Sequence, residues 1–146
     1  AYAERVSSEA ERINQKFGTR EWKPIVLVMK HYAHSVLDKL YRLANLCLVT
    51  SLHDGMNLVA KEFVAARNDE QGVLILSNFT GASRDLKGAV LVNPYSAEET
   101  AEAISAALNM AKTEQRRRMK TMREAVRNYN VYRWSAEFIK ALTSLG

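Results

Sequence analysis

The chain has 146 residues, 47% of them hydrophobic and 25% charged, which is the size and balance of one folded domain and excludes a disordered chain. Its net charge of +5 admits an anionic partner, whether nucleic acid, an acidic surface or a phosphorylated small molecule, without choosing among them. No apolar run approaches the ~20 residues of a membrane helix, and the first residues lack the apolar stretch of a signal peptide. With a single cysteine, Cys47, we expect a cytoplasmic protein that does not contact a membrane.

Helical spacing of apolar residues alternates along the chain with short, continuously apolar runs. Residues 6–17 predict a helix that ends at Gly18, and residues 25–29 predict a buried strand. Ser96 is a suitable N-cap for a later helix that follows Pro94. Further helices are predicted over residues 36–44, 58–67, 97–108, 113–126 and 132–145, and further strands over residues 46–49, 73–76 and 89–92.

Strands that are apolar throughout and joined by crossovers predict a parallel sheet covered on both faces. The third crossover, residues 77–88, leaves room for about one turn of helix. We therefore predict an α/β fold: a Rossmann-like parallel sheet of about four strands with flanking helices and extra C-terminal helices. Such sheets bind ligands outside the carboxyl ends of their strands, where residues 30–34, 50–57 and 77–81 lie.

The segment from residue 50 to residue 62 carries the most chemical information, because it reads as strand, tight loop and helix. Gly55 permits a positive φ, and the following helix presents N–H groups near residues 56–59 that suit a phosphate. The Asp54 carboxylate suits sugar hydroxyls, and Glu62, further along the helix, suits the two hydroxyls of a ribose. Together these features indicate a nucleotide-sugar.

Plainer interpretations of the same residues remain open. An Asp-Gly pair before a helix is commonly only a turn, and Glu62 is commonly only a solvated helix residue. Gly-x-Gly-x-x-Gly and Walker sequences are absent, as is a Gly-x-Ser-x-Gly nucleophile elbow. The three histidines, His31, His34 and His53, have neither a second cysteine nor a His-x-x-x-His spacing, so no metal site is predicted.

A basic run near the end of the chain offers nucleic-acid binding as an alternative. Residues 116, 120, 123 and 127 form one stripe, but no aromatic residue interleaves with them. We interpret the stripe as a solvated face opposite Met119, Met122 and Val126, and expect no nucleic-acid partner. Three other apolar residues are predicted to be buried: Cys47, Trp134 and Phe138.

Residues 44–66, which include the string LVTSLHDGMNLVAKEFVAA, closely resemble the donor-site segment of trehalose-6-phosphate synthases. The resemblance covers almost the whole chain, and the string Asp-Gly-Met-Asn-Leu-Val-x-x-Glu is its most specific part. It continues through residues 12–18, 22–24, 72–82 and 92–95 and ends near Trp134. These synthases are retaining glycosyltransferases with the two-domain GT-B architecture, so residues 1–146 would be one partial domain, a portion of the C-terminal, nucleotide-sugar-binding domain.

The resemblance implies transfer of glucose from UDP-glucose to glucose 6-phosphate, with retention and without a protein nucleophile, metal or other cofactor. By position, Asp54 would bind hydroxyls of the donor glucose, and Glu62 would bind the ribose. Leu37 would offer backbone groups to the uracil. The backbone that would hold the sugar and the diphosphate belongs to Gly55, Met56, Asn57, Leu58 and Val59.

Three departures from the family pattern bear on activity. The N-terminal acceptor domain is absent, and the arginine and lysine that clamp the diphosphate would precede Ala1. His53 stands where the family usually has arginine, and residues 32–34 lack an expected basic residue. We therefore expect the isolated chain to bind donor without turnover. Transfer to another acceptor such as glycerol 3-phosphate, a non-catalytic sugar-nucleotide sensor and a homo-oligomer all remain open.

Overall fold

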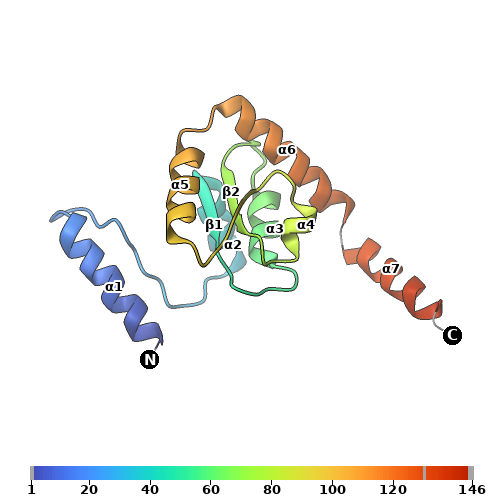
Figure 1. Cartoon of the computed structure of the whole chain (residues 1–146). Coiled ribbons are helices and arrows are strands. Elements are labelled where there is room, and N and C mark those ends of the chain that lie inside the picture. The colour runs from blue at the N-terminus through green and yellow to red at the C-terminus, as the bar shows by residue number, and fades with distance from the viewer. Residues whose placement is uncertain (1, 130, 145–146) are drawn as a thin grey trace. The chain divides into compact units, whose positions relative to one another are not determined.

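The computed structural model describes residues 2–129 and 131–144, except for the side chain of Val131 (Figure 1). The chain divides into two compact units, residues 1–33 and residues 34–146. Each unit has its own internal contacts, and the predicted ligand loop falls within the second.

The first unit contains the helix α1 (Tyr2–Phe17), which confirms the predicted opening helix. Its end is set by Gly18, whose N–H donates to the Asn14 carbonyl at 2.8 Å. A Cβ at Gly18 would collide with that same carbonyl oxygen, so only glycine fits this helix end. The Asn14 side-chain amide both donates to and accepts from the backbone of Ile25, each at 2.9 Å.

The buried strand predicted at residues 25–29 is wrong. Within the described residues no strand pairs with this segment, and Val26 and Met29 are 80% and 64% exposed. An apolar run becomes a strand only when another strand supplies backbone partners, and here the Asn14 side chain takes both backbone groups of Ile25. The sheet of the described residues accordingly has three strands, one fewer than predicted.

The second unit is built on a parallel sheet with the strand order β1-β2-β3. Leu46 pairs with Val73, and Ile75 pairs with Val90, so each strand lies beside the one that follows it in sequence. The one-turn helix predicted in the third crossover is present. In chain order the elements are α2 (His34–Leu43), β1 (Leu46–Val49), α3 (Leu58–Ala66), β2 (Val73–Ser77), α4 (Ala82–Asp85), β3 (Val90–Val92), α5 (Ala97–Leu108), α6 (Lys112–Asn128) and α7 (Val131–Thr143).

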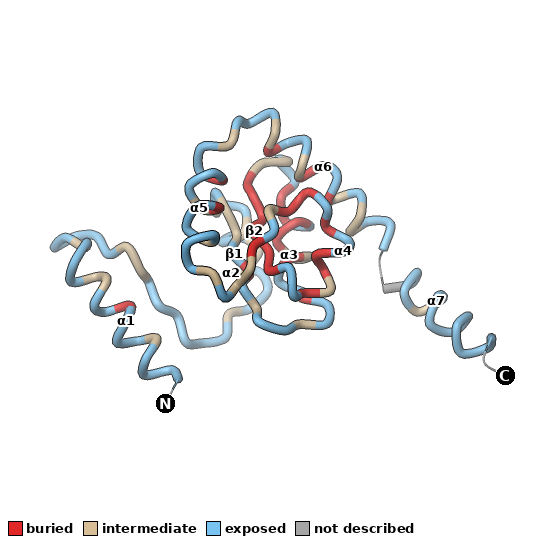
Figure 2. Tube along the Cα trace, viewed as in Figure 1, coloured by how far each residue is buried: buried red, intermediate tan, exposed pale blue. Residues whose placement is uncertain are grey.

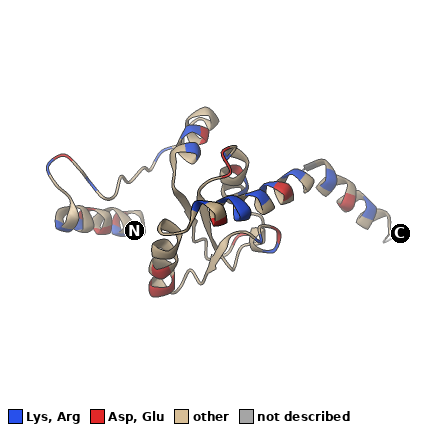
Figure 3. Cartoon of the chain, turned by 90° about the horizontal axis from the view of Figure 1, so that it is seen from above, with Lys and Arg blue, Asp and Glu red and all other residues tan. Residues whose placement is uncertain are grey.

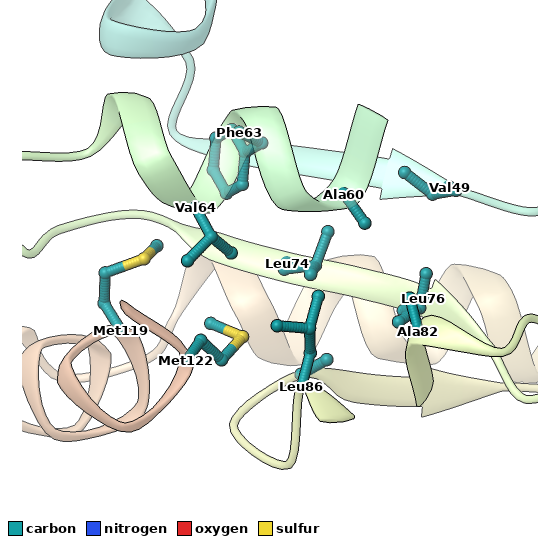
Figure 4. Packing of buried hydrophobic residues seen from close by; sticks show 11 residues of the cluster. Val49, Ala60, Phe63, Val64, Leu74, Leu76, Ala82, Leu86, Met119 and Met122 are labelled. Carbon is teal, nitrogen blue, oxygen red and sulfur yellow. The ribbon is translucent and has the colours of Figure 1, made fainter. Parts of the chain in front are cut away.

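Helices cover both faces of the sheet, as predicted. Alternate residues of β2 point to opposite faces, so its apolar side chains must be buried on both. Leu74 and Leu76 are fully buried in one cluster with Phe63 of α3, as the close-up shows (Figure 4). Val73 and Ile75 enter a second cluster on the opposite face, beneath α5. The buried positions therefore concentrate on β2 and on the helix faces turned toward it (Figure 2).

The helix α6 buries Met119 and Met122 against α3. Basic residues recur along the length of this helix (Figure 3). Arg123 differs from the predicted solvated stripe, because its guanidinium donates to the carbonyls of Val64 and Ala65 at the end of α3, at 3.0 and 2.9 Å. It therefore caps a neighbouring helix.

The prediction that Trp134 and Phe138 belong to the core is wrong. Both are 51% exposed on α7, and their rings stack on each other with centroids 5.3 Å apart. Helical spacing of aromatic residues brought the two rings together, but no other element of the described chain covers them fully. Cys47 is partly buried against the core, and burial raises the pKa of its thiol to about 11. Across the described residues, no helix is both long and apolar enough to cross a membrane.

The packing of α2 against α3 depends on Arg67, which is 5% exposed. Its Nη1 donates to three carbonyls at the end of α2, those of Tyr41, Arg42 and Ala44, at 2.9, 2.7 and 2.6 Å. The rest of the guanidinium forms two hydrogen bonds with the Asp69 carboxylate. One buried side chain thus satisfies the last carbonyls of a helix and joins it to the next.

Replacing Arg67 with methionine keeps the aliphatic packing but removes every donor. We expect Arg67→Met to lower the free energy of unfolding by about 2–4 kcal/mol, because the α2 carbonyls lose their partner in a buried site. Urea unfolding followed by circular dichroism measures this. Arg42→Met is the matched control, since the Arg42 side chain is exposed and pairs with Asp38 of its own helix at 2.7 Å. Equal losses in the two variants would contradict the role given to Arg67.

Candidate functional site

Two loops at the carboxyl ends of β1 and β2 are joined by backbone contacts. Asp54 and Thr80 form an isolated parallel bridge, and the Gly81 N–H donates to the Asp54 carbonyl at 2.9 Å. A Cβ at Gly81 would collide with the Gly55 carbonyl oxygen, so the loops approach this closely only because residue 81 is glycine. The bridge fixes the loop after β1 against the loop after β2.

The Asp54 carboxylate organises its own loop. Oδ1 accepts from the N–H groups of Met56 and Asn57 at 3.1 and 2.9 Å, and Oδ2 accepts from the Asn57 side-chain amide at 2.8 Å. These donors, the Asn57 side chain first, lower the pKa of Asp54, so the carboxylate stays ionised at neutral pH. A carboxylate has about four acceptor positions. Asp54 uses three of them and therefore keeps about one for a sugar hydroxyl.

Asn57 is the residue of the loop with a left-handed backbone, at φ 57°. Gly55 would permit a positive φ, but among the glycines of the described chain Gly72 adopts one. Asparagine adopts this conformation more readily than most residues, because its short polar side chain can form local hydrogen bonds. Here Oδ1 caps α3 by accepting from the Ala60 N–H at 2.9 Å, and Nδ2 donates to Asp54. Gly55 instead leaves open space where a side chain would stand.

The N-terminus of α3 offers fewer free N–H groups than predicted. Asp54 takes those of Met56 and Asn57, and Asn57 takes that of Ala60. The N–H groups of Leu58 and Val59 lie in the first turn, where a helix has no internal acceptor, and no hydrogen bond in the described chain uses them. Both residues are largely exposed. This helix end can therefore present two amides and the positive end of its dipole to an anion.

Glu62 lies one turn into α3 and borders a cavity of about 500 Å³ between α2 and α3. Its Oε2 accepts from the Tyr41 hydroxyl at 3.3 Å, and its Oε1 lies 3.8 Å from His34 Nε2. The side chain is 33% exposed, so the carboxylate is accessible yet held from one side. The lining residues are His34, Ser35, Asp38, Tyr41, Glu62, Ala65 and Ala66.

Leu37 does not line this cavity. It is the fourth residue of α2, where a helix begins to use N–H groups in its own hydrogen bonds. On α2 the residues that border the cavity are its polar neighbours, among them Ser35, Asp38 and Tyr41. Sequence reasoning missed Tyr41, and the only signal for it was its place on the α2 face that meets α3.

A second cavity of about 490 Å³ lies on the other side of α3. Its lining includes Gly55, Met56 and Leu58 of the predicted site, together with Trp134 of α7. Lys61 Nζ and Asp85 Oδ2 face each other there at 3.4 Å. Of the predicted site residues, Glu62 lines the first cavity and Gly55, Met56 and Leu58 line the second, so α3 contributes to the walls of both.

An aromatic row extends over the loops at the same edge of the sheet. The His53 ring lies 6.1 Å from that of Phe79, which in turn lies 5.9 Å from that of Tyr95. All three side chains are exposed. No group of three histidine, cysteine, aspartate or glutamate side chains is arranged to hold a metal ion in residues 2–129 and 131–144.

The chain is similar to known proteins along nearly its whole length. The profile of glycosyltransferase family 20 matches residues 1–144. The bifunctional trehalose-6-phosphate synthase/phosphatase of Thermoproteus tenax is 46% identical over 139 residues, which are 95% of this chain and 19% of that protein. The glucosylglycerol-phosphate synthase of a Synechocystis species is 42% identical over 131 residues, 90% of this chain and 26% of its own length.

Among solved structures, a trehalose-6-phosphate structure from E. coli bound with UDP-2-fluoro glucose superposes with a TM-score of 0.92. It is 40% identical, and the match covers 96% of this chain and 31% of the other. The chain therefore spans about a third or less of the length of these relatives. Since the family profile covers nearly every residue, the chain belongs to glycosyltransferase family 20.

Proposed function

We propose that this chain is the donor-binding portion of a retaining glycosyltransferase that moves glucose from UDP-glucose to glucose 6-phosphate. The observation that carries the proposal is the loop at residues 54–59, which ends in a helix with two free N–H groups one turn before Glu62. The E. coli structure bound with UDP-2-fluoro glucose matches 96% of the residues of this chain, and this similarity supports the same class of donor.

In the proposed complex the diphosphate lies at the start of α3, where the N–H groups of Leu58 and Val59 and the helix dipole favour negative charge. The ribose hydroxyls donate to Glu62, one turn along the same helix. Asp54 contributes mainly by shaping the loop, and its remaining acceptor position serves a glucose hydroxyl. Gly55 lets the ligand approach the backbone, because no side chain occupies the space beside it.

The proposed transfer takes place on one face of the sugar and needs no protein nucleophile, metal or other cofactor. As the glycosidic bond breaks, negative charge grows on the departing UDP, and the free amides of α3 stabilise that charge. The departing phosphate accepts the proton of the acceptor hydroxyl. By resemblance to the family, an arginine and a lysine would clamp the diphosphate, and we propose that they belong to the first part of the donor domain, outside residues 1–146.

Turnover assays separate the proposed function from its alternatives. We expect the purified chain to bind UDP-glucose without making trehalose 6-phosphate, because we propose that the acceptor domain lies outside residues 1–146. A longer protein that contains it is expected to release UDP with glucose 6-phosphate and not with glycerol 3-phosphate. Release with glycerol 3-phosphate alone would assign the other acceptor, and donor binding without release in the longer protein would indicate a sensor.

Replacing the Glu62 carboxylate with an amide tests the ribose contact. Glu62→Gln is expected to weaken UDP-glucose binding by about ten- to hundredfold, which corresponds to ~1.5–3 kcal/mol for a hydrogen bond to a charged group. Isothermal titration calorimetry, or an NMR titration if binding is weak, measures the dissociation constant. Glu102→Gln on α5 makes the same chemical change at an exposed residue and should leave it unchanged. An unaltered constant in Glu62→Gln would remove the ribose assignment.

Two glycine substitutions separate the ligand surface from the loop junction. Gly55→Ala should leave thermal stability unchanged while it weakens donor binding, because the new methyl enters open space that the ligand would occupy. Gly81→Ala should lower the melting temperature, because its methyl collides with the Gly55 carbonyl. Thermal unfolding and titration are measured on both variants. Normal donor binding by Gly55→Ala would contradict the proposed path of the ligand.

A further inference from the structure

The Tyr41 side chain reaches from α2 to α3 and contacts the carboxylate of Glu62. Its hydroxyl donates to Glu62 Oε2 at 3.3 Å, and both residues line the same cavity. The Tyr41 ring meets the Phe63 ring edge to face, with centroids 6.2 Å apart, and it packs against the main core cluster. The ring of Tyr41 thus packs against the core, while its hydroxyl contacts the Glu62 carboxylate that we propose binds the ribose.

Tyr41 is also held through its backbone. Arg67 Nη1 donates to the Tyr41 carbonyl at 2.9 Å, and the same guanidinium lies over the Phe63 ring at 5.8 Å. Arg67, Phe63 and Glu62 all belong to α3 or its C-terminal cap. The hydroxyl of Tyr41 therefore has a fixed position relative to the helix that carries Glu62.

The acceptor positions on Glu62 determine what such a contact can do. A carboxylate can accept about four hydrogen bonds, and Tyr41 uses one of them on Oε2. His34 Nε2 is 3.8 Å from Oε1, beyond hydrogen-bond distance, and its side chain is 81% exposed. Three positions remain, which are enough for the two hydroxyls of one ribose.

We propose that Tyr41 is a positioning residue that orients the Glu62 carboxylate toward the 2′ and 3′ hydroxyls of a nucleotide ribose. This inference rests on the proposed function of Glu62 and adds the residue that makes it selective for a ribose diol. A glutamate on a helix surface turns freely about its side-chain bonds, so a fixed donor on one oxygen reduces the entropy lost when a diol binds the other.

The protonation state of Tyr41 is compatible with this role. Burial, and then the negative charge of Glu62, raise the pKa of the Tyr41 hydroxyl to about 12. A group whose pKa lies that high remains a neutral donor throughout the neutral and mildly alkaline range. The Tyr41 hydroxyl can therefore donate to Glu62 throughout that pH range.

The test compares the binding of UDP and of 2′,3′-dideoxy-UDP to the unaltered chain and to Tyr41→Phe. Both titrations are followed by NMR, which detects millimolar affinity. Tyr41→Phe removes one oxygen and keeps the ring that packs on Phe63. We expect UDP to bind about three- to tenfold more weakly to the variant, as for one net hydrogen bond, while 2′,3′-dideoxy-UDP binds equally to both. Tyr2→Phe, at a residue 81% exposed on α1, is the matched control.

Three results would overturn the proposal, and they have different meanings. Equal weakening of both nucleotides would show that Tyr41 only supports the packing of α2. Unchanged UDP binding in Tyr41→Phe would show that Glu62 needs no orienting donor, with the donor site itself left intact. If the unaltered chain binds UDP no more tightly than 2′,3′-dideoxy-UDP, the ribose role of Glu62 fails first, and the role of Tyr41 fails with it.

Discussion

The ionised carboxylate of Asp54 is the group on which the geometry of the loop depends. Its two oxygens gather the N–H groups of Met56 and Asn57 and the side-chain amide of Asn57. This network holds Asn57 in a left-handed conformation, from which its own side chain caps α3. The cap in turn decides which N–H groups of the helix remain available. The carboxylate of Asp54 thus acts mainly within its own loop, since it uses nearly all of its own acceptor positions.

A second constraint is the junction between α2 and α3, which turns a surface helix into one wall of a cavity. Arg67 satisfies the last carbonyls of α2, and Phe63 receives the Tyr41 ring. The two contacts place α2 beside Glu62. If Glu62 binds the donor as proposed, donor recognition and helix packing share residues here. Stability and nucleotide affinity are then expected to be coupled on this side of α3 more than on the side of Gly55.

Membership of glycosyltransferase family 20 covers the chain from residue 1 to residue 144, yet this length is about a third or less of the relatives compared. The segment is similar both to a trehalose-6-phosphate synthase/phosphatase and to a glucosylglycerol-phosphate synthase. Such likeness is what a donor-binding portion would show, because enzymes with different acceptors can share one donor. The positive charge of the chain has little part in this site: much of it lies on α6, where Arg117 and Arg118 both pair with Glu114.

The sequence alone determined the alternation of elements, the parallel sheet with both faces covered, and the loop that leads into α3. Periodicity and apolar runs report which faces are buried, and the Asp-Gly-Met-Asn string is specific enough to identify the family. Local sequence patterns could not predict features that depend on contacts between residues far apart in the sequence. Residues 25–29 are as apolar as a buried strand, but no strand of the described chain pairs with them. Trp134 and Phe138 have helical spacing, but their rings stack on each other outside the core. Only the tertiary structure placed Asn57 rather than Gly55 at the left-handed position and brought Tyr41 to Glu62, because both arrangements result from side-chain hydrogen bonds and helix packing that sequence spacing does not record.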